Sequence, residues 1–460
     1  MSTDKNVIDF CGRFCYNRRK VCDQLIKIKL IIVRAGSLRR RIGGIQMGYL
    51  FFQTKEVSGA FNRKLNDFKA SLGSAIGKGE NITFADQDIT HLLKLQHDRI
   101  SRKGLEFDCE TYSRDEGKNR FTAGSCWQDA HYESTVCFHS CGIKRNVKKD
   151  GKKKYSDDRK CVLYETITDV VTGAHPDNDP FCCPNCGAVT TVAGLQDGCP
   201  HCGTRFQMDD LFPKVTSYYF LEDPGMTKKE FKTGYLVSYI MTLITMFILG
   251  FILKREIGFY IAAAIGSIVI AYFLYVYYLL MKLIVGAIAA AGKMGTAGSR
   301  RKFESRMKRI TPEFSYEYFT SKTLSLIKTA VFSENESELL FYEGEPLDPK
   351  MKDIIDMNYG GALGCKRVRE EGNFVTVVTK AYFDVLYASG DKVYFKKQIF
   401  SATLKRRTDI PVNLSFSMTK IACPSCGASF DATKHKSCPY CGNKYEITTD
   451  DWALAELKYQ

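Results

Sequence analysis

The sequence predicts an α+β fold in which two cone-like modules, each a group of helices with a curved antiparallel sheet followed by a cysteine-rich ribbon, are separated by a transmembrane helical hairpin. Three observations predict this fold. A paired cysteine motif occurs twice, two long uncharged apolar runs lie between the copies, and similar strand patterns precede each copy. The 460 residues are enough for about three domains, and a composition of 45% apolar and 25% charged residues is typical of packed structure.

The first observation is the motif CPxCG, which occurs as two pairs. The first pair supplies Cys183, Cys186, Cys199 and Cys202, and the second supplies Cys423, Cys426, Cys438 and Cys441. Two cysteines separated by two residues can bind one metal ion from a tight turn, and the glycine that follows tolerates the positive φ of that turn. Because two such turns complete a closed tetrahedral site, we expect two zinc ribbons, at 181–212 and 420–446, each with one structural zinc ion.

Disulfide pairing is the alternative interpretation of these eight cysteines. Twelve residues lie between Cys186 and Cys199, and eleven lie between Cys426 and Cys438. Two complete pairs at near-equal spacing favour zinc. Because thiolates require a reducing compartment, both ribbons are expected in the cytoplasm.

The apolar runs 235–253 and 257–281 contain no charged residue and are separated only by Lys254, Arg255 and Glu256. Each run is long enough to cross a hydrocarbon layer of about 30 Å. Lysines and arginines flank the hairpin, 233–292, on both sides, which places both flanks in the cytoplasm. The sequence therefore predicts a multi-pass protein of the cell membrane with both termini in the cytoplasm. Residues 283–292 either prolong the second helix or lie along the membrane surface.

The first 45 residues carry eleven Lys or Arg against three Asp. Two interpretations stay open, a basic amphipathic helix on anionic lipid and an ordinary helix packed on its own domain. The net charge of +15 also raises nucleic acid as a partner. The excess charge gathers beside the predicted membrane surface and in a predicted hairpin loop, 144–154, without the aromatic residues that stack on bases. Nucleic acid is therefore not expected as a partner.

The segments that precede the two ribbons repeat one pattern. A strand at 373–387, a turn at 388–391 and a return strand at 392–406 precede the second ribbon, and strands at 132–143 and 160–171 precede the first. Thr311 followed by Pro312 predicts a helix start in the second half, and a short helix is expected within 349–357. The repeat defines a first module at 46–180, a second module at 305–410 and a C-terminal tail at 447–460.

The segment Ile310–Phe319 (ITPEFSYEYF), together with Asn373–Val377 (NFVTV) and the return strand around Ile399 and Phe400, resembles the Tim-forty-four-like domain. This domain is part of the membrane tether of the mitochondrial import motor, and it also occurs in bacterial membrane proteins, some with zinc ribbons. The resemblance covers about residues 305–407 and, more faintly, 84–171. It implies a nuclear-transport-factor-two-like cone that binds proteins or lipid instead of catalysing a reaction.

Other cysteines and motifs do not indicate further chemistry. On a strand, Cys137, His139 and Cys141 stand about 6.5 Å apart, too far to converge on one ion. Cys11, Cys15, Cys22 and Cys182 are expected to be reduced thiols. The chain has no P-loop, dinucleotide-binding glycine motif, HExxH or nucleophile elbow, so no catalytic residue is predicted.

These patterns together predict a non-enzymatic, membrane-anchored, zinc-binding scaffold or tether that holds partner proteins or lipids at the cytoplasmic face of the membrane. Its expected partners are membrane lipid and proteins, with a homo-oligomer as a further candidate. The competing interpretation is an accessory subunit or oligomeric component of a membrane transport system, which the lack of ionisable residues in both spans disfavours. A third interpretation, a sensor of nucleic acid or zinc, predicts salt-dependent nucleic-acid binding or readily exchanged metal.

Overall fold

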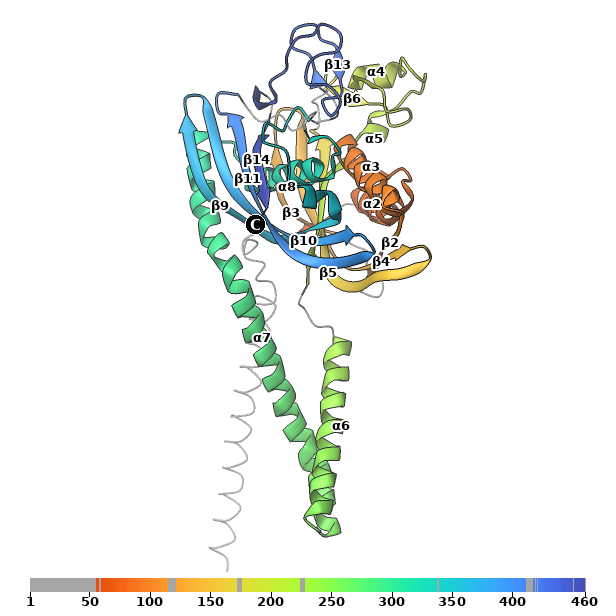
Figure 1. Ribbon diagram of the computed structural model, residues 1–460, viewed down its shortest axis with the longest axis vertical. Helices are drawn as coiled ribbons and strands as arrows, with labels where there is room; N and C mark the ends of the chain where they lie inside the picture. The colour runs from red at the N-terminus through yellow and green to blue at the C-terminus, as the bar shows by residue number, and fades with distance from the viewer. Residues whose placement is uncertain are drawn as a thin grey trace, which may run out of the picture. The chain divides into compact units, whose positions relative to one another are not determined.

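The computed structural model describes residues 55–57, 59–114, 121–171, 176–223, 228–336, 339–410, 417, 419, 421–449 and 451–459. These residues form a mixed α+β structure with two large antiparallel sheets, two long apolar helices and two cysteine-rich segments (Figure 1). The predicted N-terminal segment, 1–45, with its three cysteines, lies outside the described residues.

The first sheet is built around a long hairpin. Its strands are β1 (Lys55–Glu56), β2 (Leu105–Ser113), β3 (Thr122–Gln128), β4 (Tyr132–Lys149), β5 (Lys152–Val170) and β8 (Lys214–Glu222). β4 pairs with β5 along its length, and β2 and β3 pair with different parts of the other edge of β4. The hairpin turn consists of Asp150 and Gly151, with φ of 51° and 68°, the conformation that a two-residue Asp-Gly turn requires.

The predicted basic loop at 144–154 is therefore wrong. Only Asp150 and Gly151 turn, and the basic residues on either side continue β4 and β5. Lys144 and Arg145 lie opposite Asp158 and Asp157 on the neighbouring strand, so their charges are balanced across the sheet.

The second sheet contains β9 (Ile354–Glu371), β10 (Phe374–Ser389), β11 (Lys392–Arg407) and β14 (Ala453–Tyr459), in the order β14-β11-β10-β9. The strands predicted at 373–387 and 392–406 are confirmed as β10 and β11, which meet at the turn formed by Gly390 and Asp391. Residues 447–460, expected as a separate tail, instead contain β14, which pairs with β11 and completes the sheet.

The two sheets have the same strand path. β2-β4-β5-β8 in the first sheet and β9-β10-β11-β14 in the second are runs of antiparallel neighbours. In each half, a cysteine-rich segment lies in the sequence between the third and fourth strands of this path. Each cysteine-rich segment is therefore an insertion within its sheet, with strands before and after it.

The helices outside the apolar hairpin and the cysteine-rich segments pack on these sheets. They are α2 (Gly59–Lys78), α3 (Gln87–Arg102), α8 (Tyr316–Phe332) and the short 3-10 helix η2 (Pro349–Asp353). α2 and α3 pack on β2, and α8 packs on β9 and β14. Gly73 and Gly77 let α2 lie close to β2, because a Cβ at either position would collide with the carbonyl oxygens of Cys109 and Phe107.

The helix start predicted at Thr311 is wrong. Thr311 ends the preceding helix, and its backbone N–H donates to the carbonyl of Met307. Ser315 is the N-cap of α8, since its hydroxyl accepts a hydrogen bond of 3.2 Å from the Tyr318 backbone N–H. The short helix expected within 349–357 is confirmed as η2.

One hydrophobic core joins the two sheets. It contains residues of α2, α3 and the first sheet together with residues of the second sheet, namely Ile355, Leu386 and Ala388. Buried Arg145 of β4 bridges the same boundary, with 2.6 Å ion pairs to Asp157 of its own hairpin and to Asp356 of β9. The two sheets are thus docked on each other, a question that the sequence leaves open.

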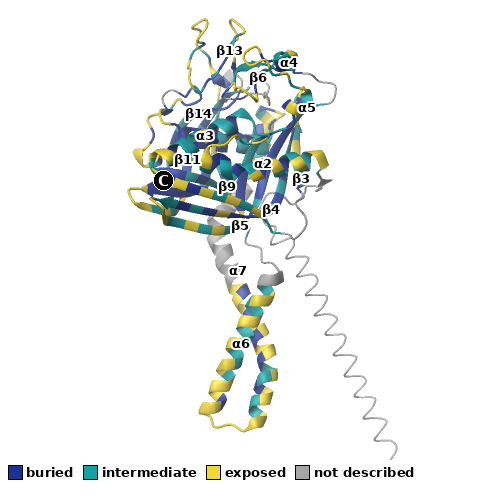
Figure 2. Ribbon diagram, turned by 90° about the vertical axis from the view of Figure 1, so that its right-hand side faces the viewer, coloured by how far each residue is buried: buried dark blue, intermediate teal, exposed yellow. Residues whose placement is uncertain are grey.

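The two apolar helices are α6 (Lys228–Ile252) and α7 (Ile257–Ile310). They form a hairpin in which the Tyr235 hydroxyl donates to the Ile268 carbonyl (3.0 Å) and Ser238 donates to the Ala271 carbonyl (3.3 Å). The segments Phe231–Ile252 and Ile257–Met281 are long and apolar enough to cross a membrane. Only 11% and 17% of their most apolar windows are buried, and Figure 2 shows largely exposed residues along both helices, unlike the core helices of a soluble protein.

Helix α7 continues beyond its apolar span to Ile310, so it is prolonged through residues 283–292. Its last turns belong to the core of the second half, where Phe303 and Met307 are 4% and 0% exposed. The Phe303 ring contacts the rings of Phe314 and Phe319 at 5.5 and 5.3 Å between centroids. Helix α7 therefore contains the apolar span and also packs, with its last turns, in the core of the second half.

Candidate metal centres

Each cysteine-rich segment begins with a small hairpin. In the first segment this is β6 (Pro180–Cys182) with β7 (Val189–Thr191), followed by the short helices α4 (Val192–Asp197) and α5 (Met208–Leu211). In the second it is β12 (Ile421–Ala422) with β13 (Ser429–Phe430), followed by the 3-10 helix η3 (Ile447–Thr449). The first two cysteines of each set lie in the turn of this hairpin, and the other two lie in a second loop.

The four CPxCG turns share one backbone geometry. In the first turn the Gly187 N–H donates to the Cys183 carbonyl (2.8 Å), and the Cys183 N–H donates to the Ala188 carbonyl (2.8 Å). The same two bonds recur at the other three turns, at 2.8 or 2.9 Å. The glycine of each turn has φ between 72° and 75°, which explains why glycine follows every second cysteine.

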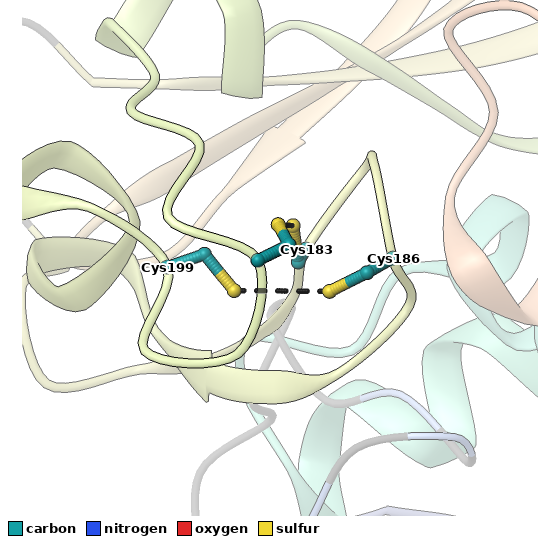
Figure 3. A group of neighbouring side chains, drawn as sticks. Cys183, Cys186 and Cys199 are labelled. Carbon is teal, nitrogen blue, oxygen red and sulfur yellow. Dashed lines mark hydrogen bonds between the residues drawn. The ribbon is translucent and has the colours of Figure 1, made fainter.

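This geometry brings the predicted ligands together as two groups of four. Within each group all four sulfur atoms lie within 4.8 Å of one another. In the first group the Sγ atoms of Cys186 and Cys199 are 3.8 Å apart (Figure 3). Those of Cys183 and Cys202 are 3.6 Å apart. The corresponding pairs of the second group, Cys423 with Cys441 and Cys426 with Cys438, are 3.6 and 3.7 Å apart.

These distances fit a tetrahedral metal site. Four sulfurs at about 2.3 Å from a zinc ion form a tetrahedron with edges of about 3.8 Å. A disulfide would bring two sulfurs to about 2.05 Å, and all eight cysteines are free thiols. The structure therefore supports two metal-binding groups over the disulfide alternative.

Each group has a buried side and an exposed side. Cys183 and Cys199 are buried, while Cys186 and Cys202 are exposed, and the second group repeats this pattern. The Thr204 hydroxyl, 3.4 Å from Cys202 Sγ, is the main cause that lowers the pKa of Cys202 to about 6. The backbone N–H of Cys426 is the main cause that lowers the pKa of Cys423 to about 7. Burial raises the pKa of Cys183 to about 12, so thiol acidity differs within a group, and the arrangement of the sulfur atoms carries the metal assignment.

The first ribbon is fixed to the sheet that precedes it. Tyr132, the first residue of β4, packs with Phe181 and Phe212 in the core of this ribbon, and its hydroxyl donates to Asp179 at 3.0 Å. Lys64 of α2 donates to the backbone carbonyl of Phe212 at 3.1 Å. Burial and the neighbouring carboxylate raise the pKa of Tyr132, so its hydroxyl stays protonated as a donor.

The second ribbon is held by a helix of the first half. Asp88, in the first turn of α3, accepts hydrogen bonds from Ser417 Oγ (2.5 Å) and from Thr419 Oγ1 and N (3.1 Å each), just before this ribbon begins. β13 of this ribbon also lies next to β7 of the first ribbon. The two ribbons therefore extend the packing between the halves.

The remaining sequence candidates do not form a third centre among the described residues. Cys141 faces Cys161 on the neighbouring strand, with 3.4 Å between their Sγ atoms, and Cys137 lies opposite Glu165. Cys182 is buried beside the first metal group but is not a member of it. The interpretation of these side chains as reduced thiols fits their geometry.

Sequence reasoning missed a buried ion pair in the second half. Asp451 is 0% exposed, lies 2.9 Å from Lys322 Nζ and accepts a 2.6 Å hydrogen bond from the Tyr318 hydroxyl. In the sequence Asp451 is one of two adjacent carboxylates near the end of the chain, and no local signal separates it from a surface residue. Only the pairing of β14 with β11 brings it beneath α8.

Comparisons with protein-family models, with curated proteins and with solved structures gave no match to this chain.

Proposed function

We propose that this protein is a membrane-anchored, zinc-binding scaffold that holds partner proteins or lipids at the cytoplasmic face of the cell membrane. The observation that carries the proposal is the continuity of α7. This single helix contains one apolar span, Ile257–Met281, and ends with Phe303 and Met307 in the core of the second half. A helix with both properties fixes a folded unit to a membrane without a flexible linker.

The chain arose, we propose, by duplication of one module around the membrane hairpin. The equal strand paths of the two sheets support this, as does the insertion of a four-cysteine segment at the same point of each path. Helices also precede both sheets in matching order, α2 and α3 before β2, and the end of α7 with α8 before β9. A duplicated module docked on itself presents two related surfaces, which suits a protein that brings partners together.

The membrane orientation follows from two independent arguments. A hairpin of two spans returns the chain to its starting side, so both halves lie on one side of the membrane. Reduced cysteines throughout both halves suit the cytoplasm, and the lysines and arginines at both flanks of the hairpin suit the same side. Both ribbons and both termini are therefore assigned to the cytoplasm.

Zinc is the metal proposed for both four-cysteine groups, because four thiolates at tetrahedral spacing are its usual structural site. Cys183, Cys186, Cys199 and Cys202 would hold one ion, and Cys423, Cys426, Cys438 and Cys441 the other. Four cysteine ligands leave no position for water or substrate. The role assigned to zinc is to hold each ribbon in its fold, and catalysis is not part of the proposal.

The resemblance to the Tim-forty-four-like domain adds to this proposal. Residues 305–407 comprise the end of α7, α8 and the sheet strands β9, β10 and β11, an arrangement compatible with a cone of helices on a curved sheet. Members of that family bind proteins or lipid, and we propose the same class of partner for this chain.

Photocrosslinking in cells tests the proposal. A photoreactive amino acid is placed at three exposed positions, Lys144 on the first sheet, Tyr394 on the second and Tyr440 on the second ribbon, and captured species are identified by mass spectrometry. Phe251, which is 79% exposed in the hairpin, is the control and should capture lipid. Reproducible capture of a few proteins by the sheets or ribbon supports a scaffold. Capture of lipid at a sheet or ribbon position supports the lipid-binding alternative. Capture of neither lipid nor any protein other than the chain itself at these three positions contradicts the proposal.

A further inference from the structure

The last turns of α7 border a basic groove that the proposed scaffold function does not use. The groove has a volume of about 750 Å³ and lies between α7 and the edge strand β9, which run side by side in Figure 1. It is lined by Arg301, Lys302, Ser305, Arg306, Arg309 and Ile310 of α7 and by Glu370 of β9. Four cationic side chains thus face one carboxylate.

The charges in this groove are poorly compensated. Arg306 lies 3.6 Å from Glu370, and both side chains are about half exposed (51% and 52%). Among the described residues, no carboxylate lies within ion-pair distance of Arg301, Lys302 or Arg309. Residues 302 and 306 are four apart, and 306 and 309 are three apart, so these cations are neighbours on one face of the helix and repel one another.

Other basic residues of α7 each have a carboxylate partner, which distinguishes them from the cations of the groove. Arg300 pairs with Glu317 at 2.6 Å and lies over the ring of Tyr316, and Lys308 pairs with Glu304 at 3.0 Å. The helix therefore carries cations that are each paired with a carboxylate, and a separate group of four in the groove that has only Glu370 within ion-pair distance among the described residues.

We propose that this groove binds a multiply charged phosphate anion supplied from solution. Three guanidinium groups present planar pairs of N–H donors that match phosphate oxygens, and Lys302 adds a fourth positive charge. One such anion neutralises the positive charge of the four cations that Glu370 alone does not balance. The hydroxyl of Ser305 adds an uncharged hydrogen-bonding group to the groove wall.

Lipid headgroups carry the same phosphate chemistry, and the length of α7 separates the two sources. Twenty residues from Met281 to Arg301, at about 1.5 Å per residue, place the groove roughly 30 Å along the helix from the end of the apolar span. Surface potentials decay over about 8 Å at physiological ionic strength. The choice of a soluble source, unlike the groove itself, rests on the membrane span assigned under the proposed function.

Calorimetry of the full chain tests this site. The protein is reconstituted in phosphatidylcholine nanodiscs and titrated with inorganic pyrophosphate, and zinc is measured afterwards to exclude metal loss. We expect saturable binding of one equivalent that weakens at least tenfold in Arg306→Gln/Arg309→Gln. The matched control Lys396→Gln removes an exposed cation on β11 and should bind as the unmodified chain does. Unchanged thermal unfolding verifies that the double variant folds.

Two results would overturn the proposal. One is the absence of saturable binding, or equal binding by the unmodified chain and the double variant. The other comes from nanodiscs that contain phosphatidylglycerol. A groove roughly 30 Å along the helix from the end of the apolar span should bind pyrophosphate with the same affinity in both lipids. A tenfold weaker affinity in the anionic nanodiscs, abolished in Arg306→Gln/Arg309→Gln, would show that lipid headgroups occupy the groove instead.

Discussion

Glu165 is a carboxylic acid inside the apolar core of the first half. It is 0% exposed, and neither of its oxygens has a hydrogen-bond partner among the described residues. Burial raises the pKa of this carboxyl well above its ordinary range, against a smaller opposing effect of Lys69. We therefore expect Glu165 to be protonated in the folded protein at neutral pH.

Because Glu165 is protonated in the folded protein, the free energy of unfolding is expected to depend on pH. The unfolded carboxyl ionises near pH 4.3, while the folded carboxyl keeps its proton, so above this pH the unfolded state binds fewer protons and the free energy of unfolding falls as pH rises. Glu165→Gln mimics the neutral acid without this loss. The variant should match the unmodified protein at pH 4 and be more stable at pH 7, with a difference that grows by about 1.4 kcal/mol for each pH unit above the unfolded pKa until the pH reaches the folded pKa.

Thermal unfolding of both proteins at the same series of pH values measures the difference, and any acid sensitivity of the ribbons cancels. A stability difference that does not change between pH 4 and pH 7 would contradict a neutral Glu165.

Asp451 is a second residue whose buried environment determines how strongly its substitution destabilises the fold. The ion pair with Lys322 is buried, and Asp451 contributes to the raised pKa of Lys322 despite its desolvation. Asp451→Asn should cost about 3–5 kcal/mol, because it removes the carboxylate that lies 2.9 Å from the buried ammonium of Lys322. Lys322→Met/Asp451→Asn removes both charges and should recover part of that loss. Denaturant unfolding of the single and double variants gives the comparison, and equal stability of the two would argue against the buried pair.

At the scale of elements, the ribbons make the sharpest prediction. A structural zinc site contributes on the order of 10 kcal/mol of apparent folding free energy. Cys186→Ser should therefore reduce bound zinc from two ions to one and unfold the first ribbon, while the sheets remain folded. Cys126→Ser, at an exposed cysteine outside both groups, is the matched control and should retain both ions. Metal analysis with limited proteolysis measures both effects, and two retained ions in Cys186→Ser would exclude the assignment.

Elements with strong local signals were predictable from the sequence. The CPxCG spacing specifies the turn and its glycine, and the unbroken apolar runs specify the two membrane-length helices. β10 and β11 were predictable because a two-residue turn joins long strands. The two groups of four cysteines that could hold a metal ion were therefore predictable from the sequence.

Elements that depend on distant partners were not predictable. β8 and β14 are short strands that follow a ribbon in the sequence. Each pairs with the strand that precedes that ribbon. The lysine-rich ends of β4 and β5 resemble a loop in sequence because the carboxylates near their lysines come from distant segments, Asp108 of β2 and Asp391 of the turn between β10 and β11. The buried cluster of Asp451, Lys322 and Tyr318 was missed for the same reason, since Asp451 is distant in sequence from Lys322 and Tyr318 of α8.

At the scale of the molecule, the docking of the two sheets is the main structural result. Arg99 of α3 donates to the carbonyls of Met351 and Ile354 at 3.1 and 3.3 Å, and of Ser333 at 3.1 Å, so a buried arginine of the first half caps segments of the second. With the shared core, this contact should make the two halves unfold as one cooperative unit.

Arg145 provides the test of this docking. Arg145→Leu leaves the partly buried Asp157 and Asp356 without their shared cation, and it should cost about 3–5 kcal/mol. Hydrogen exchange should rise around Asp356, on the other half of the molecule from the substitution, as well as in β4 and β5. Faster exchange confined to β4 and β5 would show that the halves are energetically independent.

The central claim is that both docked halves are anchored on the cytoplasmic side of a membrane by one helical hairpin, and cysteine labelling tests it most directly. Lys254→Cys lies between the two spans, and Lys152→Cys and Lys392→Cys lie in the main hairpins of the two sheets. A membrane-impermeant maleimide should label Lys254→Cys in intact cells, and the other two variants only after permeabilisation. Labelling of the sheet positions in intact cells, or an unlabelled Lys254→Cys, would contradict the account.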